Sequence, residues 1–185
     1  MTLLETFSKY TLTSGQSSLI DELEKFLSDQ TPCFLLKGYA GTGKTFLMKG
    51  LTDFLLQSKR NFVIAAPTGR AAKVISQKTK HKACTIHKTI YSSKELKEFK
   101  TKDEDGTETF KFYFEVKIND DPNNTVYIID ESSMISNVYS EGEFFRFGSG
   151  FLLKDLFKHI NFDNNDHNKK IIFIGDNAQL PPVNM

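Results

Sequence analysis

The sequence predicts an α/β fold in which a mainly parallel sheet is flanked by helices. Four short apolar runs are continuous rather than alternating, as expected of strands that are buried on both faces of a parallel sheet. Stretches with helical periodicity lie between the runs, and strands that alternate with helices are typical of a doubly wound domain. The predicted strands cover residues 33–36, 62–66, 126–129 and 171–174.

Three segments between these runs are expected to form helices. In residues 17–27 apolar side chains recur every three or four positions, and Ser14 or Ser17 can serve as the N-cap. Residues 45–56 repeat the pattern, and residues 144–160 show it less regularly.

Composition restricts the class of protein. The chain has 185 residues, 39% hydrophobic and 25% charged, so we expect one folded domain rather than a disordered segment. No apolar run reaches the roughly 18 residues of a membrane span, and the start has no signal-peptide pattern, so we expect no contact with a membrane. Cys33 and Cys84 are too few for a disulfide framework or a zinc site, which favours a reducing, cytoplasmic location.

Charge is distributed unevenly along the chain. The net charge is +1, but residues 59–102 hold twelve Lys and Arg against two acidic residues. A basic segment of this kind is typical of a surface that binds a polyanion. A solvated lysine face is the alternative interpretation.

A polar, turn-forming cluster follows each apolar run. The clusters read GYAGTGKT, PTGRAA, DESSM and GDNAQLPP in chain order. Ligands of open α/β sheets bind beyond the carboxyl ends of the strands. We therefore expect the four clusters to converge on one crevice.

The first cluster matches the phosphate-binding pattern G-x-x-x-x-G-K-[ST]. Its glycines let the backbone curl so that N–H groups face an anion, at which the following helix directs its positive end. Lys44 is expected to reach the β- and γ-phosphates of ATP, and the Thr45 hydroxyl to bind Mg²⁺. A glycine-rich turn with a surface lysine is the alternative. The residues expected to hold the nucleotide are Gly38, Ala40, Gly41, Thr42, Gly43, Lys44 and Thr45.

The third and fourth clusters supply further groups for phosphate chemistry. Asp130 follows its strand directly and can hold Mg²⁺, while Glu131 beside it can orient and deprotonate the attacking water. Alternatively, the pair caps a helix that starts near Ser132. In the fourth cluster Gln179 can hydrogen-bond the γ-phosphate or the water, with Asp176 also at the nucleotide, unless the cluster is only a polar turn.

Taken in order, these motifs resemble those of a helicase family. Residues 38–45, 66–72, 85–91, 128–134 and 175–183 resemble motifs I, Ia, Ib, II and III of superfamily 1 DNA helicases, most closely the 5′-to-3′ branch with the RecD and Dda types. Gln16 lies where that family keeps a glutamine that reads the adenine edge.

The resemblance implies a RecA-like P-loop NTPase domain over residues 1–185 that hydrolyses ATP with Mg²⁺. Lys44, Glu131 and Gln179 would act in catalysis, and single-stranded DNA would run over motifs Ia and Ib. For His87, packing is the alternative to DNA contact. The implied DNA contacts, with a basic neighbour, are Pro67, Thr68, Arg70, Lys73, Thr85 and His87.

The family also implies a second RecA-like domain, whose arginines stabilise charge on the transferred phosphoryl group. No arginine follows Arg146 and the sequence stops soon after motif III, so we expect an N-terminal piece of a longer helicase. An arginine finger is worth on the order of 10³–10⁵ in rate, so the piece alone should hydrolyse ATP weakly.

Residues 94–120 are expected to form an inserted β-hairpin. Apolar side chains alternate with polar ones from Phe110 to Ile118, next to an Asp-Gly turn. We expect the phenylalanine face to pack onto the core. The resemblance adds a second interpretation, a pin that separates strands at a duplex junction.

Two classes of function remain open on the sequence. The first is the motor domain of an ATP-dependent DNA helicase in replication, repair or recombination, and an RNA-directed motor is a variant of it. The second is a P-loop switch that acts on a protein partner without nucleic acid. The basic segment coincides with motifs Ia and Ib, which favours the first.

Overall fold

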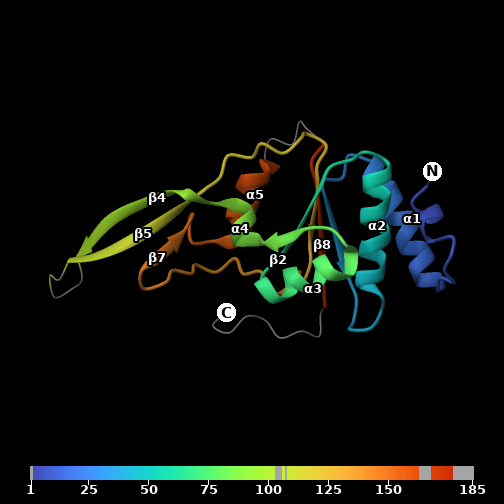
Figure 1. Cartoon of the computed structure of the whole chain (residues 1–185), viewed down its shortest axis with the longest axis horizontal. Coiled ribbons are helices and arrows are strands. Elements are labelled where there is room, and N and C mark those ends of the chain that lie inside the picture. Colours follow the sequence, from blue (N-terminus) through green and yellow to red (C-terminus); the bar gives the residue numbers. More distant parts are fainter. Residues whose placement is uncertain (1, 103–105, 107, 163–167, 177–185) are drawn as a thin grey trace.

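The computed structural model describes residues 2–102, 106, 108–162 and 168–176, and it confirms the predicted α/β fold. A five-stranded parallel sheet has the order β1-β8-β6-β2-β3 (Figure 1). All four predicted strands are present, and β3 adds a fifth whose three residues are too few to show a pattern. The strands are β1 (Cys33–Lys37), β2 (Phe62–Ala66), β3 (Ala83–Thr85), β6 (Val126–Ile129) and β8 (Lys170–Gly175).

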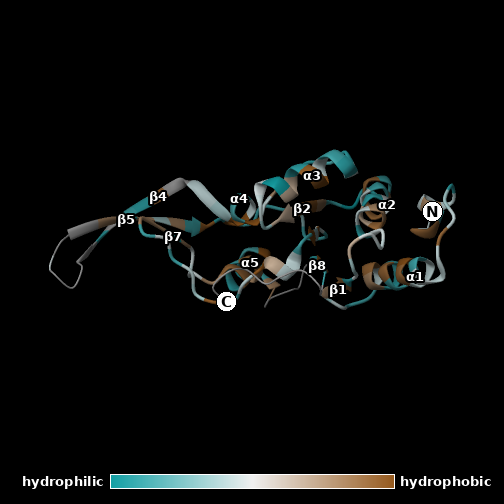
Figure 2. Ribbon diagram, turned by 90° about the horizontal axis from the view of Figure 1, so that it is seen from below, coloured by the Kyte–Doolittle hydropathy of each residue, from teal (hydrophilic) through white to brown (hydrophobic). Residues whose placement is uncertain are grey.

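Helices cover both faces of this sheet, and each face has its own core. Two neighbouring residues of β6 belong to different cores: Ile128 packs in the core on one face of the sheet, and Ile129 packs in the core on the other. In Figure 2, the helix α3 carries both hydrophobic and hydrophilic residues. The first face holds α1 (Ser14–Ser28), α2 (Lys44–Gln57) and α3 (Gly69–Thr79), and the second holds α4 (Ile86–Ile90) and α5 (Leu152–Ile160).

Two short 3₁₀ turns complete the body of the domain. The turn η1 (Leu4–Phe7) precedes α1 and contributes Phe7 to the first core, and η2 (Ser132–Met134) follows β6. In the described part of the chain, no helix is both long enough and apolar enough to cross a membrane.

The N-terminus of α1 differs from the expected one. Thr13, rather than Ser14 or Ser17, is the N-cap, and its side chain accepts a hydrogen bond from the Gln16 N–H. The Gln16 side chain accepts one from the Thr13 N–H in return, at 3.1 Å, which completes a capping box. The helix begins after Thr13 because these two hydrogen bonds satisfy two N–H groups at the end of the helix.

The helix expected over residues 144–160 is wrong in its first half. There the chain forms a strand, β7 (Phe145–Phe147), and the helix α5 begins only at Leu152. Gly148 and Gly150 separate the two with φ values of +50° and +83°, which a helix cannot accommodate.

A second, three-stranded sheet extends away from the main body (Figure 1). Its strands β4 (Tyr91–Lys102) and β5 (Glu108–Val116) pair antiparallel as a hairpin, and β7 joins β5 in parallel. The phenylalanine face packs only near the body. Phe110, farther along the hairpin, is 46% exposed, and Ile118, which follows the end of β5 next to the body, is 88% exposed.

Candidate nucleotide-binding site

The polar clusters that follow β1, β6 and β8 meet at the carboxyl edge of the sheet, as the sequence predicts. β8 lies between β1 and β6, so the three strands end side by side. The Gly38 N–H donates to the Gly175 carbonyl at 3.2 Å, which links the first cluster to the fourth. β2 ends next to β6 at the same edge, since the Asp130 N–H donates to the Ala65 carbonyl of β2 at 3.0 Å, so the cluster after β2 begins beside the third cluster.

The loop between β1 and α2 has the geometry of an anion cradle. Gly41 and Gly43 adopt left-handed conformations, with φ of +80° and +92°, which side chains other than glycine rarely adopt. A Cβ atom on Gly38 would lie 2.9 Å from the Thr42 hydroxyl, so the loop is also too tight there for a side chain. Gly43 is the N-cap of α2 and provides no side-chain cap, which leaves the first N–H groups of the helix open to an anion.

Lys44 is held at the loop by its own backbone. Its ammonium group donates to the carbonyls of Gly38 and Tyr39, the second at 2.8 Å. It also lies 3.5 Å from the carboxylate of Asp176, which is only 4% exposed. Asp176 therefore lies at the predicted site, and one of its partners is Lys44.

The Asp130 carboxyl is partly buried directly after β6. Burial raises its pKa above the usual value, and the Glu131 charge adds to the shift, while the Glu131 N–H and the Lys44 charge oppose it. A partly buried carboxylate of this kind gains from a cation. Among the described residues no three His, Cys, Asp or Glu side chains gather as a metal cluster. Mg²⁺ typically takes one or two protein ligands together with phosphates, and Thr45 and Asp130 are the residues that could hold it here.

Glu131 has a strained backbone. Its φ and ψ of +51° and +37° lie in the left-handed region, which costs a non-glycine residue on the order of 1–3 kcal/mol. It stands at the N-cap position of η2, but its side chain makes no capping hydrogen bond. The capping alternative therefore does not account for the carboxylate, and strain at this position is typical of functional sites.

Gln16 lies against the loop between β1 and α2, and its contact with the adenine edge stays a prediction. Its amide nitrogen is 3.5 Å from the Thr42 carbonyl, and a Cβ on Gly43 would come within 2.9 Å of it. The capping box and this contact together fix the side chain beside the loop. Gln179 lies outside the described residues.

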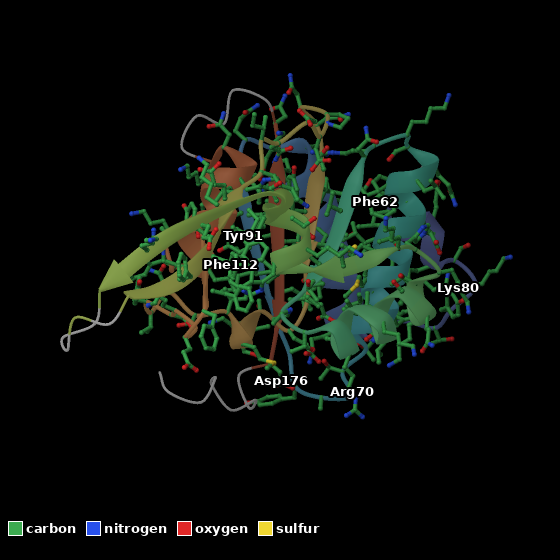
Figure 3. The ribbon with its side chains drawn as sticks, turned by 60° about the vertical axis from the view of Figure 1, so that its left-hand side comes forward. Phe62, Arg70, Lys80, Tyr91, Phe112 and Asp176 are labelled. Carbon is green, nitrogen blue, oxygen red and sulfur yellow. The ribbon has the colours of Figure 1, made fainter. Side chains whose placement is uncertain are left out.

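The predicted DNA-contact residues lie at the end of β3 and in the segments that follow β2 and β3, with Arg70 and Lys73 on α3 and His87 on α4. The hydroxyls of Thr68 and Thr85 cap α3 and α4, accepting from the N–H groups of Ala71 and Lys88. In Figure 3, Arg70 lies at the same edge of the sheet as Asp176, opposite Phe62 at the start of β2. The two cations, Arg70 and Lys73, are exposed, and Pro67 before them is partly buried.

His87 packs inside the domain. Its ring is edge-on to Phe147 at 5.0 Å and lies 5.5 Å from Tyr91, and burial lowers its pKa. Packing, the alternative that the sequence left open, accounts for this position, and a DNA contact at His87 stays a prediction.

Gly175 is a site residue that the sequence reasoning missed. A Cβ atom there would lie 2.9 Å from the Ser132 hydroxyl, so the end of β8 and the turn that carries Glu131 approach too closely for a side chain. The only signal in the sequence is a glycine at the end of an apolar run, which is also common in ordinary turns.

Comparison with known proteins decides the family. A family model described as an AAA domain matches residues 11–141. The chain belongs to this AAA-domain family. The phage T4 protein named ATP-dependent DNA helicase dda is 32% identical to this AAA domain over 80 residues, which are 43% of this chain and 18% of that protein.

Longer alignments reach two uncharacterised proteins. One, from Acanthamoeba polyphaga mimivirus, is 31% identical over 91% of this chain, and one from Methanocaldococcus jannaschii is 31% identical over 88%. The chain spans 33% and 13% of the length of these two relatives.

Among solved structures, the Pif1 helicase of Candida albicans shares the fold of this AAA domain. The TM-score is 0.52 at 17% identity, and the alignment covers 94% of this chain and 34% of that one. Together with the family match, this shows that the α/β body has a RecA-like fold, and it resembles the motor domain of superfamily 1 helicases.

The burial of Asp130 generates a prediction about stability. Asp130→Asn should raise the melting temperature of the nucleotide-free protein at pH 7, because it removes a charge from a partly buried site. A folded-state pKa above the unfolded one means that the charge destabilises the fold at pH 7, and that this penalty fades as pH falls through the raised pKa. Each kcal/mol gained corresponds to about 2–4 °C in a domain of this size.

Thermal unfolding at pH 7 and near pH 4, without Mg²⁺, measures this effect. Asp120, which is exposed, provides the matched Asp→Asn control, and its variant should melt like the wild type. An Asp130→Asn variant that gains nothing at pH 7, or gains equally at both pH values, would contradict the prediction.

Proposed function

We propose that this domain binds Mg-ATP and hydrolyses it as the motor of an ATP-dependent DNA helicase, which couples hydrolysis to movement on single-stranded DNA and to unwinding of duplex. The carrying observation is the convergence of the open α2 N-terminus, Lys44 and the Asp130–Glu131 pair at one sheet edge. The names of the T4 and Candida albicans proteins support the helicase assignment.

In the proposed reaction each residue has one task. The loop N–H groups and Lys44 bind the phosphates, and Lys44 exchanges its contacts with the loop carbonyls and Asp176 for phosphate oxygens. Thr45 and Asp130 would hold Mg²⁺, which when bound neutralises charge on the phosphates. Glu131 orients the attacking water and accepts its proton, and Gln16 contacts the adenine edge.

Nucleic acid would bind along the same edge, at the ends of β2 and β3. Arg70 and Lys73 are exposed there, within the basic segment, and their charges suit a phosphate backbone. A second RecA-like domain with an arginine aimed at the phosphates is part of the proposal. Single-stranded DNA and duplex junctions are the proposed partners.

The phosphate-binding role is tested by replacing its lysine. Lys44→Ala should weaken binding of fluorescent ATP or ADP by about 100-fold or more, because it removes the charge that faces the phosphates. Lys49→Ala is the control, since Lys49 lies on the same helix but pairs with Asp53 at 2.6 Å. Equal affinity of the Lys44 variant and the wild type would refute nucleotide binding at this loop.

The catalytic role of Glu131 has a separate test. Glu131→Gln should retain ATP binding and lower turnover by about 10²–10⁴-fold, because the amide cannot accept the proton from water. Turnover is measured in the intact protein with saturating ATP, and Glu143→Gln, an exposed replacement, is the control. Wild-type turnover in the Glu131 variant would show that the strained glutamate has only a structural role.

Nucleic-acid binding should follow the exposed cations of α3. Replacing Arg70 and Lys73 together by Ala should weaken single-stranded DNA binding and reduce the slope of log K against log salt by about 1–2, because phosphate contacts release counterions. Lys25 and Lys59, exposed at the opposite edge of the sheet, form the control pair. Binding that does not depend on salt would favour the alternative of a protein-directed switch.

A further inference from the structure

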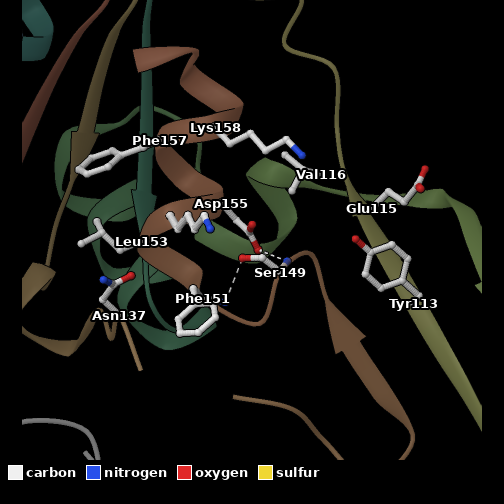
Figure 4. A pocket seen from close by; sticks show the side chains of 11 residues that line it. Tyr113, Glu115, Val116, Asn137, Ser149, Phe151, Leu153, Asp155, Phe157 and Lys158 are labelled. Atoms are coloured by element: carbon white, nitrogen blue, oxygen red, sulfur yellow. Dashed lines mark hydrogen bonds between the residues drawn. The ribbon is translucent and has the colours of Figure 1, made fainter. Parts of the chain in front are cut away.

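A cavity of about 860 Å³ lies between the helix α5 and the strand β5 of the hairpin (Figure 4). We call it the α5–β5 groove. Its volume is within the range of roughly 300–1,000 Å³ that is typical of ligand sites. None of the described residues that line it belongs to the nucleotide site or to the predicted DNA contacts, so the groove has no role in the function proposed above.

The groove and the phosphate-binding loop lie on opposite faces of the main sheet. The helix α5 packs through Leu156 and Ile160 in one core, whereas α2, which follows the loop, packs through Leu47 and Leu51 in the other. A ligand in the groove would therefore leave the nucleotide site accessible.

The floor of the groove is fixed by a buried carboxyl group. Asp155 of α5 is 1% exposed, and its Oδ2 accepts a hydrogen bond from the Tyr91 hydroxyl at 2.8 Å and one from the Ser149 N–H at 2.9 Å. A Cβ atom on Gly148 would lie 2.0 Å from the same oxygen, so this side of the carboxyl is closed. Because Asp155 already has these partners, a ligand would be recognised by the walls of the groove.

The α5 wall carries two lysines, Lys154 and Lys158, both exposed. They are one helical turn apart and therefore lie on the same side of the helix, where like charges repel. In Figure 4, Lys158 extends from α5 toward Val116 on the opposite wall. No described residue forms an ion pair or a hydrogen bond with either ammonium group, so both cations are available to a ligand.

The β5 wall does not neutralise these lysines. Its acidic residue is Glu115, which pairs with Lys97 of β4 at 2.7 Å. The other side chains of this wall are those of Tyr113 and Val116, which offer mainly apolar surface. The groove thus has a cationic wall and a largely apolar one.

The aromatic rings of the two walls are already engaged by their neighbours. The Arg146 guanidinium lies over the Tyr113 ring, 4.9 Å from its centroid, and Phe157 of α5 stacks on Phe162 at 5.0 Å. Single-stranded nucleic acid is typically held by cations together with open ring faces on which bases stack. The groove has the cations without a free stacking platform, which favours a peptide over nucleic acid.

The spacing of the lysines suits an extended peptide. Residues four apart on a helix are separated by roughly 6 Å along its axis, and side chains two apart on an extended chain by roughly 6.6 Å. Two acidic side chains at alternate positions could therefore meet Lys154 and Lys158 together. The side chain between them would point to the other wall, where Tyr113 and Val116 lie.

We propose that the α5–β5 groove is a docking site for an extended acidic segment of a protein partner, in which acidic residues alternate with apolar ones. The carboxylates pair with Lys154 and Lys158, and the apolar side chains pack against Tyr113 and Val116. The proposal goes beyond ATP and nucleic acid and does not depend on either.

The test measures binding of a defined peptide to the intact protein by fluorescence anisotropy. The probe is a labelled six-residue peptide in which aspartate alternates with leucine. Two matched peptides replace every aspartate by asparagine or every leucine by serine, and an unlabelled six-nucleotide single-stranded DNA serves as competitor.

The charge-reversed protein is Lys154→Glu combined with Lys158→Glu. It should bind the probe at least about tenfold more weakly than the wild type, because two attractions become repulsions. Lys25→Glu with Lys59→Glu, exposed at a different part of the surface, is the matched control and should stay within about twofold of wild type. Melting temperature and affinity for fluorescent ATP, which should not change, show that each variant is folded.

Both matched peptides should bind more weakly than the probe, since one lacks the charges and the other the apolar side chains. A probe that binds the wild type and the charge-reversed variant equally, or does not bind the wild type, would overturn the docking site. Equal affinity of the asparagine peptide would overturn recognition of an acidic segment. Displacement of the probe by the DNA, with DNA binding weakened by the same charge reversal, would show that the groove binds nucleic acid instead.

Discussion

The side-by-side ending of β1, β8 and β6 is the constraint on which the nucleotide site depends. The Gly38–Gly175 hydrogen bond ties the phosphate-binding loop to the end of β8, and on its other side Gly175 meets Ser132 with no space for a side chain. The loop, Lys44 with Asp176, and the turn that carries Glu131 are thus fixed relative to one another by strand pairing. Rigid placement of this kind is what phosphoryl-transfer chemistry requires, since the protein contributes mainly positioning and electrostatics.

Two unfavourable features lie at the same edge. Asp130 is partly buried with its pKa raised, and Glu131 has a left-handed backbone. Both cost stability in the nucleotide-free protein, and a bound cation would relieve the first. The cores on the two faces of the sheet, in which Ile128 and Ile129 are fully buried, supply the stability that offsets these costs.

The strands and the phosphate-binding loop could be predicted because the patterns that indicate them are local in the sequence and do not depend on distant partners. Continuous apolar runs located four strands, and a glycine motif after the first located the loop. The features that the sequence did not reveal depend on distant partners. β7 forms a strand because Phe145 and Phe147 pair with β5, and Asp155 reads as an ordinary helix residue until Tyr91, 64 positions away, is placed against it.

The capping residue of α1 shows the same limit on a smaller scale. Several serines and threonines precede the helix, and composition does not distinguish them. Thr13 is selected because Gln16, three positions later, completes the reciprocal bond and also reaches the phosphate-binding loop. One side chain therefore sets both the start of the helix and the edge of the nucleotide site.

The hairpin is joined to the end of β3 by a very short connection. α4 has five residues, begins directly after β3 and ends directly before β4, and its Ile86 and Ile90 are fully buried. Thr85 caps α4 at the carboxyl edge of the sheet, and Tyr91 begins the hairpin at the other end of α4. A displacement of the β3 end would therefore either move the hairpin with it or break the packing of α4, and the second would cost several buried contacts. The fold thus links the end of β3, where the proposal places nucleic acid, to the hairpin through one turn and a half of helix.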